Sequence, residues 1–230
     1  MPPETRWIQA VALDMDGLTL NTEDLYGEVG QMMMARRGKR FTDTVRRGMT
    51  GRPAPEAYAV LIQAEGLKET WQELHRECTE LLDELVPQRV APMPGLLTLL
   101  DELDRLRLPR CIATSSPHTF AAKALRHAGV DSRIDFIVTA NDVARGKPAP
   151  DIYHLAALRM ACDPTRLLVL EDSPIGAEAG VQAGCQVIAV PSPHVEDSTF
   201  EGIHRRVSRL DAPEITLALH SIAWPPTTTG

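Results

Sequence analysis

Short apolar runs that end in polar residues recur along the chain and predict buried strands. They are IQAVALDMD (8–16), RCIATSS (110–116), DFIVTAND (135–142), LLVLED (167–172) and QVIAVPS (186–192). Helical patterns lie between the later runs, over Thr119–His127, Asp151–Met160 and Gly176–Ala183. Apolar strands that alternate with helices indicate a parallel sheet with helices on both faces. We therefore expect an α/β fold.

Residues 21–92 break this alternation, because they contain helical patterns and no convincing strand. Asn21 with Asp24 can cap a helix that runs to about Arg37. Thr70 with Glu73 forms a capping box for a helix that runs to about Val86. We expect an inserted all-helical cap domain over 21–92 and an α/β catalytic core made of 1–20 and 93–230.

Composition narrows the possible partners. The 230 residues carry a formal net charge of −7, and the basic residues between Arg36 and Arg47 lack interleaved aromatics, which argues against nucleic-acid binding. No apolar run approaches the ~20 residues of a membrane helix, and the start lacks a secretory signal. Four scattered cysteines form no zinc motif or disulfide framework. We expect a cytoplasmic protein, monomeric or weakly homodimeric, with a small-molecule partner.

The first strand ends in two carboxylates, Asp14 and Asp16, which point the same way in an extended chain. This pairing suits a nucleophile next to a general acid/base, and a carboxylate can attack phosphorus to form an aspartyl-phosphate. Two carboxylates repel a phosphate dianion, so the chemistry requires a hard cation such as Mg²⁺. Glu171 and Asp172, which end the fourth run, can supply further metal ligands. Alone, such a pair is more often found in surface or capping positions.

Two other run ends carry polar groups. Thr114, Ser115 and Ser116 precede Pro117, so hydroxyls and free backbone N–H groups at a helix start could bind phosphate. A helix N-cap is the simpler interpretation of that segment taken alone. Lys147 follows the third run and could neutralise both a nucleophile and a phosphate, although an isolated loop lysine is usually surface. Carboxylates, hydroxyls and a lysine that follow successive runs together favour an active site over these simpler interpretations, because ligands bind beyond the carboxyl ends of parallel strands.

The segments DMDG, ATSS, GKPAPD and LEDSPIGAEAG resemble, in order and approximate spacing, the four motifs of the haloacid dehalogenase superfamily, in its subgroup with a helical cap. The resemblance implies a Rossmann-like core and the following roles. Asp14 is the nucleophile and Asp16 the acid/base, with its backbone carbonyl on Mg²⁺. Thr114 and Ser115, with Ser116 beside them, bind the phosphoryl group. Lys147 bridges that group to Asp14, and Glu171 and Asp172 complete the metal site.

The same resemblance separates the functional alternatives. Asp16 favours phosphoryl transfer from an oxygen leaving group over dehalogenation, so we expect a phosphatase of small phosphorylated metabolites, with sugar phosphates the first choice. Gly51 and Arg52 resemble a cap loop that reaches the substrate. A β-phosphoglucomutase-like mutase is the alternative, although Tyr26 stands where mutases carry a histidine four residues after a threonine, here Thr22. A non-catalytic binding module is a third possibility that no motif residue supports.

Overall fold

A computed structural model describes residues 7–49, 52, 54–195 and 198–223 of the protein. The chain divides into two compact units. The first consists of Met1–Asn21 with Ala91–Gly230, and the second of Thr22–Val90.

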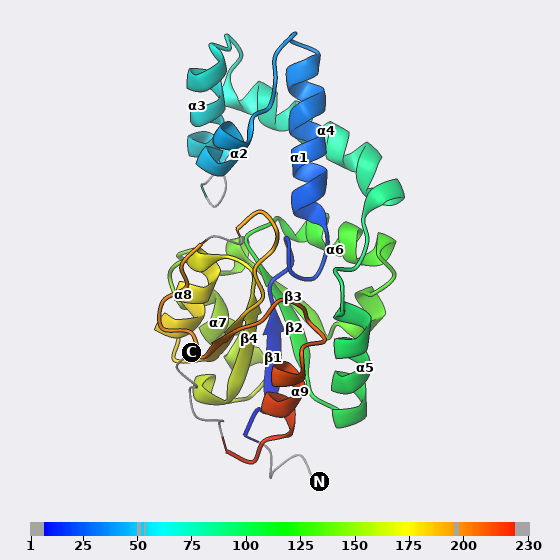
Figure 1. The fold of residues 1–230 in the computed structure, drawn as a ribbon, viewed down its shortest axis with the longest axis vertical. Helices are drawn as coiled ribbons and strands as arrows, with labels where there is room; N and C mark the ends of the chain where they lie inside the picture. The colour runs from blue at the N-terminus through cyan, green and yellow to red at the C-terminus, as the bar shows by residue number, and fades with distance from the viewer. Residues whose placement is uncertain (1–6, 50–51, 53, 196–197, 224–230) are drawn as a thin grey trace. The chain divides into compact units, whose positions relative to one another are not determined.

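The first unit is built on one parallel sheet with the strand order β3-β2-β1-β4-β5-β6 (Figure 1). Its strands are β1 (Ala10–Leu13), β2 (Arg110–Thr114), β3 (Phe136–Thr139), β4 (Leu167–Glu171), β5 (Gln186–Ala189) and β6 (Arg205–Arg206). The expected parallel α/β sheet is confirmed. The sequence pattern did not predict β6, because a two-residue edge strand has no periodicity to detect.

Most helices of this unit connect successive strands, and the last helix follows the last strand. They are α5 (Leu96–Leu106), α6 (His118–His127), α7 (Asp151–Arg159), α8 (Pro174–Gln182) and α9 (Pro213–His220), with single 3₁₀ turns η2 (Asp131–Arg133), η3 (Ala140–Asp142) and η4 (Pro164–Arg166). Helices α7 and α8 lie on one side of the sheet, and α5 lies on the other (Figure 1). None of the described helices in either unit is long and apolar enough to cross a membrane.

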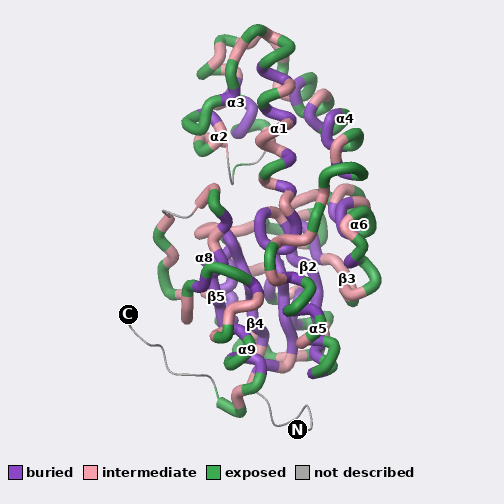
Figure 2. Tube along the Cα trace, turned by 45° about the vertical axis from the view of Figure 1, so that its right-hand side comes forward, coloured by how far each residue is buried: buried purple, intermediate pink, exposed green. Residues whose placement is uncertain are grey.

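The core of this unit follows from side-chain alternation in strands that are buried throughout (Figure 2). Ala10 and Ala12 of β1 pack with the apolar faces of α7 and α8, together with Val169 and Val187. Residues one position away in each strand point to the opposite face. On that side α5 is amphipathic, because its buried leucines recur at helical spacing: Leu96, Leu99, Leu100, Leu103 and Leu106.

The second unit contains only helices among its described residues: α1 (Thr22–Ala35), α2 (Asp43–Met49), α3 (Ala54–Glu65) and α4 (Trp71–Arg89). Helix α4 begins at the predicted capping box, in which Thr70 and Glu73 bond reciprocally. It continues past Val86 to Arg89, although Pro87 lies inside it. Pro87 has no N–H to donate to the carbonyl oxygen of Asp83, so the helix lacks one hydrogen bond shortly before it ends.

Ion pairs join the helices of the second unit. Glu77 of α4 accepts hydrogen bonds from Arg36 (2.8 Å) and Arg37 (2.7 Å), and Arg37 also contacts Glu69 at 2.7 Å. The sequence analysis considered these basic residues only as a cluster and did not predict the partners of Arg37. Its partners come from a different helix and loop, so periodicity within one segment could not reveal them.

The Arg37–Glu77 pair gives the first prediction. The guanidinium of Arg37 holds the pKa of Glu77 below its usual value. The pair therefore stabilises the fold fully above the unfolded pKa of Glu77 and loses this effect as the pH falls through the lower folded pKa. We expect Glu77→Gln to cost about 1 kcal/mol at pH 7 and progressively less below about pH 4.

Thermal unfolding of both proteins at several pH values would measure this difference. Glu80→Gln, at an exposed position of the same helix, is the matched control and should be neutral. An equal loss for both variants, or a loss at Glu77 that does not depend on pH, would contradict the prediction.

Candidate active site

Polar side chains from four strand ends meet at one edge of the sheet. Asp14 directly follows β1, Thr114 ends β2, Lys147 lies in the loop after β3, and Glu171 ends β4. Strand β1 lies between β2 and β4, where the strand order changes direction. Parallel α/β sheets bind ligands at such a switch point, beyond the carboxyl ends of the strands.

Lys147 is the centre of this arrangement. Its side chain is 5% exposed, and Nζ donates to Asp14 Oδ1 at 2.6 Å, Glu171 Oε1 at 2.6 Å and the Ala113 carbonyl oxygen at 2.8 Å. An ammonium has three N–H donors. All three are therefore used, and they bind together β1, β2 and β4.

The buried charged groups shift one another's pKa values. Burial alone would lower the pKa of Lys147, but the nearby carboxylates of Asp14 and Glu171 raise it overall, so the ammonium stays charged. Burial raises the pKa of Asp14 well above its usual value, and Lys147 opposes this shift. A divalent cation near Asp14 would likewise favour its ionised form.

Asp16 is held by hydroxyl groups rather than by the lysine. Its Oδ2 accepts hydrogen bonds from Thr114 Oγ1 at 2.9 Å and from Ser116 Oγ at 2.8 Å. Thr114 Oγ1 also accepts from the Ser116 backbone N–H at 2.9 Å, while Ser115 is exposed. The structure thus brings Thr114 and Ser116 to the second carboxylate and leaves Ser115 at the surface.

Glu171 is fully buried and is held through both of its carboxylate oxygens. Oε1 accepts from Lys147 and from the Tyr153 hydroxyl at 2.7 Å, and Oε2 accepts from the Ser173 hydroxyl at 3.1 Å and backbone N–H at 3.2 Å. The sequence analysis missed Tyr153 and Ser173. The serine before Pro174 is a recognisable N-cap signal, and a tyrosine on an apolar helix face calls for a buried acceptor.

The acidic residues can hold a metal ion. Asp14, Glu171 and Asp172 are all buried, and one carboxylate oxygen of each lies within 4.8 Å of the others. Oxygen ligands from carboxylates suit Mg²⁺, so these three residues fit the expected metal. The Asp16 carboxylate is not in this cluster, and its expected contribution is the backbone carbonyl oxygen.

Two small residues shape the site. A Cβ atom on Gly176 would lie 1.8 Å from Glu171 Oε1, so only glycine leaves room for this carboxylate. Gly17, directly after Asp16, has a φ of 83°, which favours glycine. In the same turn the Thr19 hydroxyl donates to the Asp14 carbonyl oxygen. These contacts fix the backbone that carries both aspartates.

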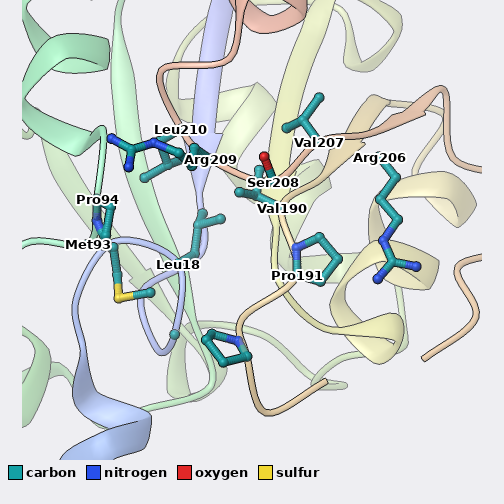
Figure 3. Close-up of a pocket in the computed structure, with 12 residues that line it drawn as sticks. Leu18, Met93, Pro94, Val190, Pro191, Arg206, Val207, Ser208, Arg209 and Leu210 are labelled. Carbon is teal, nitrogen blue, oxygen red and sulfur yellow. The ribbon is translucent and has the colours of Figure 1, made fainter. Parts of the chain in front are cut away.

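A separate pocket of about 480 Å³ lies in the first unit, beside the turn at Gly17 and Leu18. Its other walls come from the segments that follow β5 and β6 and from Met93 and Pro94. Figure 3 shows the guanidinium groups of Arg206 and Arg209 at opposite ends of the pocket. The clustered carboxylates are not among the described residues that line it.

The remaining predicted site residues belong to the second unit. Arg52 is exposed between α2 and α3, and its backbone N–H donates to the Met49 carbonyl oxygen at 3.2 Å. Gly51 lies outside the described residues.

Comparison with known proteins identifies the family. A model of haloacid dehalogenase-like hydrolases matches residues 11–190, which include both aspartates, the lysine and the Glu171–Asp172 pair. The chain therefore belongs to this family of hydrolases, and the resemblance seen in its motifs is confirmed.

Its relatives include named phosphatases. The chain is 36% identical over 200 residues to (DL)-glycerol-3-phosphatase 2 of Arabidopsis thaliana, covering 83% of this chain and 82% of the relative. It is 30% identical over 181 residues to a phosphorylated carbohydrates phosphatase of Thermotoga maritima, covering 79% and 84%. A crystal structure provisionally named as a β-phosphoglucomutase, also from Thermotoga maritima, matches with a TM-score of 0.73 and 27% identity, covering 89% and 95%.

Gly176 gives a second prediction. Alanine normally favours a helix over glycine by up to about 1 kcal/mol, but at this position its Cβ must displace Glu171. We expect Gly176→Ala to destabilise the protein by about 1–3 kcal/mol, which thermal unfolding would measure.

Gly27→Ala in helix α1 is the control, because a Cβ there has no neighbour within 4 Å. This control should be neutral or stabilising. A Gly176→Ala protein as stable as the control would show that Glu171 can move at no cost.

Proposed function

We propose that the protein is a Mg²⁺-dependent phosphoric monoester hydrolase that works through an aspartyl-phosphate on Asp14. One observation supports this above all: a buried carboxylate lies 2.6 Å from a buried ammonium, next to a second carboxylate held by two hydroxyls. The carboxylate of Asp14 is suited to attack phosphorus, and the carboxylate of Asp16 is suited to transfer a proton.

In the first step a carboxylate oxygen of Asp14 attacks the phosphorus atom of the substrate. The bond between phosphorus and the ester oxygen breaks, and protonated Asp16 gives its proton to the departing alcohol. Lys147 remains charged beside Asp14 and stabilises the negative charge that gathers on the phosphoryl oxygens. The products are the alcohol, the aspartyl-phosphate and ionised Asp16.

In the second step ionised Asp16 removes a proton from water, and the water oxygen attacks phosphorus. The bond between phosphorus and Asp14 breaks, which releases inorganic phosphate and returns both aspartates to their starting states. The Thr114 and Ser116 hydroxyls hold one oxygen of Asp16, so the carboxyl group keeps its direction through both proton transfers.

Asp14, Glu171, Asp172 and the Asp16 carbonyl oxygen would hold Mg²⁺. When bound, the ion supplies positive charge that lets an anionic substrate approach a group of carboxylates. The clustering of three buried acidic side chains supports this assignment.

We further propose a division of roles between the units. The first unit carries the clustered carboxylates and would be the catalytic core, and Thr22–Val90 would be the cap that selects the substrate. Arg52 would bind a hydroxyl or phosphate group of the substrate away from the reacting phosphorus. The names of the curated relatives, on glycerol phosphate and phosphorylated carbohydrates, support sugar or polyol phosphates as substrates. A cytoplasmic protein, monomeric or weakly dimeric, completes the proposal.

A mutase is the second candidate. The structural similarity to the provisionally named β-phosphoglucomutase favours it, since a mutase would return the phosphoryl group to a sugar hydroxyl instead of to water. Tyr26, at the position where mutases carry histidine, favours hydrolysis.

The nucleophile gives a third prediction. Asp14→Asn retains the size of the side chain but removes the negative charge, so we expect phosphate release to fall by about 10⁴-fold or more. Phosphate release in the presence of Mg²⁺ would be measured, and circular dichroism would verify the fold. Asp131→Asn, at an exposed turn, is the control and should keep full activity. An active, Mg²⁺-dependent Asp14→Asn enzyme would sink the mechanism.

The choice between hydrolase and mutase gives a fourth prediction. Phosphorus NMR would follow the protein with Mg²⁺ and a panel of sugar phosphates that includes β-glucose 1-phosphate with its 1,6-bisphosphate. We expect inorganic phosphate to accumulate from at least one substrate. Conversion of the 1-phosphate into the 6-phosphate with little free phosphate would make the protein a mutase.

A further inference from the structure

Tyr153 lies in the first turn of α7, six residues after Lys147, and is fully buried. Its hydroxyl donates to Glu171 Oε1 at 2.7 Å, and the Lys147 ammonium lies 5.3 Å from the centre of its ring. Tyr153 also belongs to the apolar cluster between α7, α8 and the sheet. The side chain thus joins the hydrophobic core to the charged site.

The hydrogen bond between Tyr153 and Glu171 stabilises both groups. A buried tyrosine hydroxyl without an acceptor costs free energy, so loss of this bond would be unfavourable for the tyrosine as well as for the carboxylate.

Glu171 links Tyr153 to the rest of the site. Its Oε1 accepts hydrogen bonds from both the Tyr153 hydroxyl and the Lys147 ammonium, and its Oε2 accepts one from the hydroxyl of Ser173 at the start of α8. Lys147 reaches from this carboxylate to Asp14. A continuous chain of contacts therefore runs from the Tyr153 hydroxyl through Glu171 and Lys147 to Asp14.

We propose that Tyr153 is a positioning residue that fixes the direction of the Glu171 carboxylate, and through it the acidic cluster that would hold Mg²⁺. The inference rests on the proposed function. Without the hydroxyl, only Lys147 and Ser173 remain among these donors to Glu171, and the carboxylate is held less firmly. The cation must then order this ligand when it binds, which weakens its affinity.

Tyr153→Phe tests this role, because it removes only the hydroxyl and keeps the ring in the core and beside the ammonium. We expect Mg²⁺ to bind about 10- to 100-fold more weakly, the usual effect of removing a group that orients a metal ligand. Titration calorimetry of the whole protein without substrate measures this affinity, and thermal unfolding verifies the fold.

Tyr58→Phe is the matched control. Tyr58 is also buried, at 7% exposed, but it belongs to α3 of the other unit. Its variant should bind Mg²⁺ with unchanged affinity. Equal affinities of the wild type and Tyr153→Phe would overturn the inference.

A second measurement uses the wild-type protein, in case Tyr153→Phe does not fold. The chain contains only three tyrosines, so the carbon bonded to each hydroxyl can be followed by NMR after ¹³C labelling and assigned with Tyr58→Phe and Tyr26→Phe. Adding Mg²⁺ should shift the Tyr153 signal and leave that of Tyr58 in place. An unmoved Tyr153 signal would overturn the inference.

The two proposals fail in different ways. A wild-type protein that neither binds Mg²⁺ nor releases phosphate overturns the proposed function, and this inference with it. A wild type that does both, while Tyr153→Phe retains the same Mg²⁺ affinity, overturns only the role of Tyr153.

Discussion

A buried ammonium group is the constraint on which the rest of the site depends. Lys147 can remain charged inside the protein only if acceptors surround it, because an unpaired buried charge is expensive. Asp14, Glu171 and the Ala113 carbonyl meet this need, and each belongs to a different strand or its immediate end. The parallel order of β2, β1 and β4 is therefore what makes the charge tolerable.

The helices next to the sheet also help to keep Lys147 paired, because they hold its partner Glu171 in place. Glu171 can serve Lys147 only because Gly176 leaves space for it, and because Tyr153 and Ser173 hold its oxygens in place. These three residues come from the starts of α7 and α8. Features that are usually attributed to helix capping and core packing here also orient a carboxylate in the site.

Both units combine a buried apolar core with ion pairs between their elements. The first buries an apolar sheet between helices and holds its charges in a closed group. The second joins its helices partly through ion pairs such as Arg37–Glu77. With the reacting phosphate bound in one unit and the substrate selected by the other, substitutions in the helical unit would alter specificity without disturbing the catalytic residues.

The sequence by itself determined the strands other than β6, most of the helices and the family, because apolar periodicity and short motifs are local properties. It also placed Asp14, Asp16 and Glu171 at strand ends and Lys147 in a loop that follows a strand, and parallel strands bring their carboxyl ends to one edge of the sheet. Only the tertiary structure decided which atoms meet. The hydroxyls of Thr114 and Ser116 bond Asp16, and Tyr153 bonds Glu171 from 18 residues away in the chain. Such contacts depend on how distant segments pack, and a local sequence pattern carries no record of that packing.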